Sequence, residues 1–136
     1  ETIMISVIYG AKGSGKTKRV IDAANLAAKN ASGQVIFITD NADSLGVNPD
    51  VRFINLGEFG VKSEAEFIGF LKGMLATNFD IQKVFIDGMC RLLGLSAEDL
   101  KPVFDAVAAV AENVDFVATV SAASLPAFLK PYAENN

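Results

Sequence analysis

The chain has 136 residues, of which 51% are hydrophobic and 21% charged, and its formal net charge is −4. This length suits a single domain with a sizeable core, and this composition is that of a globular chain. With no histidine and one cysteine, Cys90, the sequence excludes an internal disulfide, the usual zinc and haem ligand sets, and Ser-His or Cys-His catalysis.

The sequence offers no support for a membrane or DNA partner. No apolar run approaches the ~20 residues of a membrane span, and no cationic leader precedes the first strand, so we expect a cytoplasmic protein. The acidic balance, without a basic stripe that carries aromatics, argues against sequence-specific nucleic-acid binding. We interpret Met4 as the natural start and residues 1–3 as an addition ahead of it.

The first elements surround a short glycine-rich segment. A largely apolar, β-branched run from Met4 to Tyr9 predicts a buried parallel strand. Residues 10–17, GAKGSGKT, then match the phosphate-binding pattern Gly-x-x-x-x-Gly-Lys-Ser/Thr at every fixed position. Helix formers from Thr17 to Lys29 predict a helix directly afterwards. A strand before and a helix after are the context that such a loop requires.

The loop has the chemistry of a phosphate cradle. Its small residues allow successive backbone N–H groups to turn inward, and the helix N-terminus adds partial positive charge. We expect Lys16 to reach the β- and γ-phosphates and Thr17 to ligate Mg²⁺. The predicted nucleotide-binding residues are Gly10, Ala11, Lys12, Gly13, Ser14, Gly15, Lys16, Thr17 and Lys18. The alternatives are a glycine-rich turn beside a basic helix face and, for Lys18 and Arg19, ordinary solvated charges.

The next elements continue an alternation of strand and helix. Residues 34–40, QVIFITD, predict a second buried strand that ends in Asp40, and residues 51–56 predict a short edge strand after a loop. Ser63 and Glu66 have the spacing of a capping box, which starts an amphipathic helix. The apolar positions of that helix are Phe67, Ile68, Phe70, Leu71, Met74 and Leu75.

The second half repeats the alternation. Residues 81–87, IQKVFID, predict a third buried strand, and residues 115–121, DFVATVS, a fourth. Between them Ser96 caps a predicted helix that carries Pro102 early, and a short helix follows from about Ser124. The inward positions of the middle helix are Leu100, Val103, Phe104, Val107, Val110 and Ala111. We therefore predict an α/β fold of three layers, α/β/α, with a mostly parallel sheet of four to five strands.

Polar residues end the predicted strands at the edge where the loop lies. Asp40, Asp87 and Ser121 each close a strand, and ligands of open parallel sheets bind beyond such carboxyl ends. A magnesium-nucleotide site needs a carboxylate opposite the threonine of the loop, and Asp87 is the best candidate. The alternative for Asp87 is the start of an Asp-Gly turn.

These two motifs resemble those of the P-loop NTPases, with GAKGSGKT as Walker A and KVFID, residues 83–87, as Walker B. The chain is most similar to the RecA-like and AAA-like ATPases and to small stand-alone bacterial P-loop proteins of unsettled function. The resemblance implies ATP and Mg²⁺ as ligands, a γ-phosphate sensor at Ser121 or Thr119, and a sensor strand between the P-loop strand and the Walker B strand. A strand after the last helix is missing, so the P-loop core would be truncated.

The sequence also departs from these ATPases. Asp87 is followed by Gly88 where many of them have a glutamate that activates water, which leaves Asp40 or Asp43 for that role, or as loop caps. Arg91 is a candidate arginine finger toward a neighbouring subunit, or a surface salt bridge. The absence of an Asn-Lys-x-Asp motif argues against a GTPase.

We therefore predict an ATP- and ADP-binding protein with slow, magnesium-dependent ATP hydrolysis, catalysed through Lys16, Asp40 and Ser121. Its partner is a second copy of itself or an unknown protein. One alternative is an interaction module that nucleotide stabilises without turnover. The other is a small-molecule kinase, for which an arginine-bearing lid is hard to find with three arginines in all.

Overall fold

The computed structural model describes residues 5–41, 46–110 and 113–133. Its centre is a five-stranded sheet in the order β1-β5-β4-β2-β3, and every pair of neighbours is parallel. The strands are β1 (Ile5–Gly10), β2 (Gln34–Thr39), β3 (Arg52–Asn55), β4 (Ile81–Ile86) and β5 (Asp115–Ser121). The prediction of an α/β fold with a parallel sheet is confirmed.

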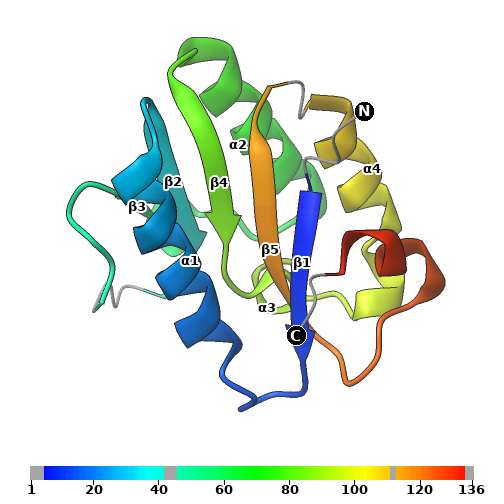
Figure 1. Ribbon diagram of the computed structural model, residues 1–136. Helices are drawn as coiled ribbons and strands as arrows, with labels where there is room; N and C mark the ends of the chain where they lie inside the picture. Colours follow the sequence, from blue (N-terminus) through cyan, green and yellow to red (C-terminus); the bar gives the residue numbers. More distant parts are fainter. Residues whose placement is uncertain (1–4, 42–45, 111–112, 134–136) are drawn as a thin grey trace.

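Helices cover the two faces of the sheet unequally (Figure 1). On one face lies α1 (Lys16–Asn30), which packs Val20 and Ala24 into a cluster with Phe37 and Phe85. On the other lie α2 (Glu64–Thr77), α3 (Met89–Leu93) and α4 (Lys101–Val110), which share a larger cluster around Phe67. Three short 3₁₀ helices, η1 (Leu56–Phe59), η2 (Ala97–Asp99) and η3 (Ala127–Tyr132), complete the described elements.

The order of the strands has the arrangement that the resemblance implies. β5 lies between β1, which precedes the glycine-rich loop, and β4, which precedes Asp87. The strands have runs of apolar residues because both faces of the sheet are covered. In β5, for example, the four successive residues Phe116 to Thr119 are each at most 6% exposed. β3 is the edge strand that the sequence predicts at residues 51–56, and its four residues are less buried.

Two local predictions are wrong, and one short helix was not predicted. The helix expected from Ser96 begins only at Lys101, because residues 97–99 form η2 and the Ser96 hydroxyl donates to the Asp99 carboxylate at 3.1 Å instead of capping. The last helix is the 3₁₀ helix η3, which begins at Ala127 and contains Pro131. The sequence pattern gives no sign of α3, because its five residues are too few to show a helical period.

Some predictions concern residues that the structure does not describe, or the last residues that it does. Met4, Asp43 and Ala111 lie outside the described residues. The strand after the last helix was predicted to be missing, and beyond η3 the described residues provide one isolated parallel bridge, between Val7 and Ala133. No helix in the described ranges is long and apolar enough to cross a membrane.

The start of α2 is a complete capping box, as its sequence predicts. The backbone N–H of Glu66 donates to the Ser63 hydroxyl at 3.2 Å. In return, the Glu66 carboxylate accepts from the backbone N–H groups of Ser63 at 3.1 Å and Lys62 at 2.8 Å. These bonds, that from Lys62 most of all, lower the pKa of the Glu66 carboxyl below its ordinary value of 4.5.

The capping box predicts a measurable contribution to stability. We expect Ser63→Ala to lower the free energy of unfolding by about 1 kcal/mol. Because the pKa of Glu66 is lowered in the folded state, its contribution is complete above pH 4.5 and is lost as the pH falls through the lower, folded value. Denaturant titrations at several pH values should show a weaker acid dependence for Glu66→Gln than for the wild type. The same acid dependence for Glu66→Gln and the wild type would contradict this role of Glu66.

Candidate functional site

The loop between β1 and α1 depends on its glycines. Gly13 and Gly15 have φ values of 84° and 90°, in the left-handed region that side chains disfavour. A Cβ atom on Gly10 would collide with the Ser14 hydroxyl. The Ser14 N–H donates to the Ala11 carbonyl at 3.1 Å, which closes a turn at the start of the loop. The backbone is thus held in a curled form that only small residues allow.

The lysines of this segment have different surroundings. The Lys16 ammonium lies over the loop, where it donates to the Ala11 carbonyl at 3.0 Å. Lys12 is exposed. Lys18 instead makes an ion pair with Asp22 at 2.9 Å on the exposed surface of α1. The structure therefore associates Lys16 with the loop, and gives Lys18 the solvated role that was the alternative for it.

Asp87 lies at the centre of a hydrogen-bond network that joins three elements. Its side chain follows β4 and is 7% exposed. The Thr17 hydroxyl, from the first turn of α1, lies 3.2 and 3.3 Å from the two carboxylate oxygens. The Thr119 hydroxyl of β5 donates to Oδ1 of Asp87 at 3.1 Å and accepts from the Gly88 N–H at 2.6 Å. Thr17 and Asp87, the predicted magnesium ligands, are in direct contact.

The register of the sheet explains why these residues meet. β5 pairs with β1 on one side and with β4 on the other, and Thr119 lies level with Ile8. On the far side of β4, the Asp87 N–H donates to the Ile38 carbonyl at 2.9 Å, which continues the pairing with β2. The Asp87 carboxylate is therefore held between neighbouring strand ends, facing the start of α1.

Asp40 and Arg91 form an ion pair beside this network. The Arg91 Nε lies 2.8 and 3.0 Å from the two oxygens of Asp40, and its Nη2 lies 3.4 Å from the Asp87 carbonyl. A Cβ on Gly88 would collide with the Arg91 guanidinium, so the glycine after Asp87 makes room for this side chain. Of the two alternatives for Arg91, the structure shows the salt bridge.

The two candidate sensor residues of β5 are placed differently. Ser121 is exposed at the end of the strand, in register with Gly10 at the start of the loop. Thr119 is 1% exposed and bonds to Asp87. Both are hydroxyl residues near the C-terminal end of β5, so their sequence positions do not separate them. The register of β5 against β4 places Thr119 beside Asp87.

Cys90 lies in α3, shortly after Asp87 and Gly88. Burial raises the pKa of its thiol, and the charge of Glu98 adds to that effect. The backbone of Ser121 and the charge of Lys16 act in the opposite direction. A raised pKa keeps the thiol protonated, so Cys90 is not an activated nucleophile.

A metal ion here would depend on few protein ligands. Within residues 5–41, 46–110 and 113–133, no three Asp, Glu or Cys side chains gather as a metal cluster. Asp87 and Thr17 offer a carboxylate and a hydroxyl in direct contact. This donor set suits Mg²⁺, which keeps several waters and takes its remaining ligands from phosphates.

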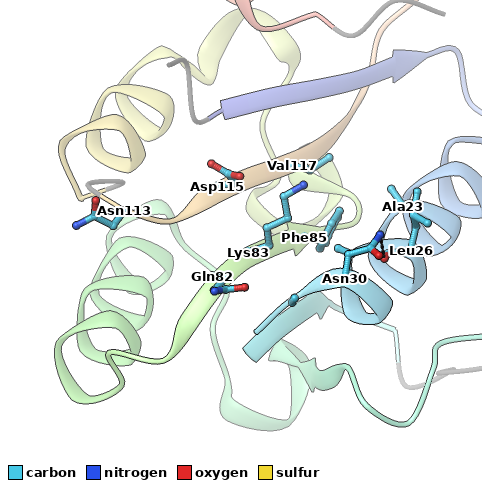
Figure 2. A pocket seen from close by; sticks show the side chains of 11 residues that line it. Ala23, Leu26, Asn30, Gln82, Lys83, Phe85, Asn113, Asp115 and Val117 are labelled. Atoms are coloured by element: carbon cyan, nitrogen blue, oxygen red, sulfur yellow. Dashed lines mark hydrogen bonds between the residues drawn. The ribbon is translucent and has the colours of Figure 1, made fainter. Parts of the chain in front are cut away.

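A separate hollow lies away from this site. It measures about 570 Å³ and lies between the C-terminal half of α1 and the beginnings of β4 and β5. Figure 2 shows Phe85 and Val117 inside it, with Lys83 and Asp115 side by side on the neighbouring strands. The Lys83 ammonium is 5.9 Å from the centre of the Phe85 ring. No loop residue lines this hollow, so it is separate from the phosphate-binding candidate.

Comparison with known proteins does not assign the chain to a family. A scan against known protein families finds no match, and no curated protein matches the chain.

The packing of Arg91 over Gly88 can be tested by a double-mutant cycle. Gly88 has φ 88° and Gly94, at the other end of α3, has φ 64°, but only Gly88 has Arg91 against it. Gly94→Ala should therefore cost about 1 kcal/mol of stability with or without Arg91. Gly88→Ala should cost about 2–3 kcal/mol in the wild type and about 1 kcal/mol in an Arg91→Ala background. Equal costs for Gly88→Ala in both backgrounds, in urea titrations, would contradict the contact.

Proposed function

We propose that this protein binds ATP with Mg²⁺ at the loop of residues 10–17 and hydrolyses it slowly. One observation carries the proposal: the hydroxyl of Thr17 lies 3.2 Å from a carboxylate oxygen of Asp87, although the two residues are 70 positions apart in the sequence. The octapeptide alone predicts a phosphate site, and this contact adds the carboxylate that a magnesium-nucleotide site needs.

The loop supports phosphate binding through its own backbone. Gly13 and Gly15, both at positive φ, allow amide groups to converge on one side, and the N-terminus of α1 adds its dipole. Lys16 already lies over the loop through its bond to Ala11. In the proposal its ammonium exchanges that carbonyl for the β- and γ-phosphate oxygens, which are better acceptors because they are charged.

The positions of Thr17 and Asp87 fit one magnesium ion. Adjacent ligands of an octahedral ion with bonds of ~2.1 Å lie about 3 Å apart, close to the observed separation of 3.2 Å. Bound there, Mg²⁺ neutralises charge on the transferred phosphate. Thr119 and the Gly88 N–H hold the Asp87 carboxylate in place, so their role is to orient it.

Turnover has weaker support than binding. Ser121, beside Gly10 at the sheet edge, is the proposed γ-phosphate sensor. Asp40 is the proposed base for water, yet both its oxygens lie within 3.0 Å of Arg91, so activation of water has to compete with this ion pair. That pair favours the second candidate, a module that binds nucleotide without turning it over. The missing guanine motif favours ATP over GTP in either case.

The assignment of Lys16 can be tested by calorimetry. Lys16→Ala should weaken ATP binding about a hundredfold or more, because it removes a charge-assisted contact with the phosphates. Lys18→Ala is the matched control, since Lys18 pairs with Asp22, and should change the affinity by less than about threefold. If Lys16→Ala binds ATP as tightly as the wild type, the loop is not the phosphate site. GTP should bind more weakly than ATP to the wild type.

Turnover can be separated from binding by measuring phosphate release. We expect the wild type to release phosphate from ATP slowly and only with Mg²⁺, and Asp87→Asn to lower the rate about a hundredfold. Asp40→Asn should lower the rate while leaving the ATP affinity unchanged. ATP binding without phosphate release would leave the module as the function, whereas phosphate transfer only to an added acceptor would indicate a kinase.

A further inference from the structure

The far edge of the sheet is open. β3 is the last strand in the order, and its outer backbone edge pairs with no strand in the described part of the chain. An unpaired edge carries a row of N–H and C=O groups that another strand can bind. The N–H and C=O groups of β3 therefore form a ready surface for pairing with another chain.

An apolar groove runs beside this edge, between β3 and α2. It has a volume of about 470 Å³. Two glycines of α2, Gly69 and Gly73, form part of its wall, and nothing lies within 4 Å of where their Cβ atoms would be. The apolar side chains that line it are Ile36, Ile54, Phe59, Phe70, Met74 and Ile81. The bare backbone of α2 leaves room for a ring to approach closely.

The same surface carries an exposed aromatic side chain. Phe59, in η1 directly after β3, is 64% exposed although its ring lies 6.2 Å from that of Phe70. Exposed rings beside an apolar groove mark interaction surfaces. The surface thus combines a projecting ring with a recess that can accept one.

The charges at the two ends of this segment are opposite. Arg52 begins β3, Glu58 lies in η1, and both side chains are exposed. Neither makes an ion pair within the described residues. A two-fold axis across the edge would run the two segments antiparallel and bring Arg52 of each copy toward Glu58 of the other.

We propose that a second copy of this chain binds here, as a two-fold dimer joined through β3 and the groove. Such an interface must be complementary to itself. This surface meets that condition in three ways: an unpaired strand edge, a ring with a recess, and two opposite charges. The dimer would extend the sheet across the axis and bury Phe59 of each copy against Gly69 and Gly73 of the other.

The charge pairing gives the sharpest test, by sedimentation equilibrium. The wild type should dimerise as its concentration rises. Arg52→Glu and Glu58→Arg should each weaken self-association about tenfold or more, because like charges then face each other. An equimolar mixture of the two variants should recover the wild-type affinity, since each interface then joins acids on one copy to bases on the other. A monomeric wild type, or a mixture that associates no better than its components, would overturn the proposal.

A matched pair of substitutions tests the groove. Phe59→Ser should weaken dimerisation about tenfold or more, whereas Leu26→Ser, at a side chain 61% exposed on α1, should not change it. Equal effects of the two substitutions would also overturn the proposal. Thermal melting of each variant, followed by circular dichroism, ensures that only folded protein is compared.

Discussion

The buried carboxylate of Asp87 is the constraint on which the rest of the site depends. A carboxylate that is 7% exposed is costly unless hydrogen bonds replace the lost water. Thr17 and Thr119 supply them, and the Gly88 N–H is satisfied in turn by Thr119. The first turn of α1, the end of β4 and the C-terminal half of β5 are thereby held together. Thr119 reaches Asp87 only if β5 lies next to β4. The geometry of the site therefore depends on the order of the strands.

Gly88, the residue after Asp87, determines which side chains can lie beside the site. Gly88 adopts a positive φ and leaves room for Arg91, which pairs with Asp40 and approaches the Asp87 carbonyl. A glutamate at position 88 would place a Cβ where the guanidinium now lies. Gly88 therefore permits the ion pair that engages Asp40, the base proposed for water activation. For this reason we propose that any turnover is slow.

The two proposed surfaces lie at different parts of the sheet. The loop follows β1 at one end of the strand order, and the proposed dimer edge is β3 at the other end. Three strands separate them, so a second copy bound along β3 leaves the loop accessible. The unequal cover of the sheet, with α1 alone on one face, also leaves a hollow beside Phe85 that belongs to neither surface (Figure 1).

Local patterns in the sequence determined the strands, the glycine-rich loop, the capping box at Ser63 and the position of Asp87 at the carboxyl edge. These features rest on periodicity and on residue types that are close in the chain, so they can be read without the fold. The tertiary structure decided what depends on distant neighbours: that Arg91 pairs with Asp40, that Thr119 and not Ser121 bonds to Asp87, and that Phe59 borders an open groove. It also decided that Ser96 bonds to Asp99 and that α4 starts at Lys101, where the capping pattern at Ser96 predicted an earlier start. The reason is physical: hydrogen bonds and ion pairs across the sheet are set by strand order and register, which a local pattern does not encode.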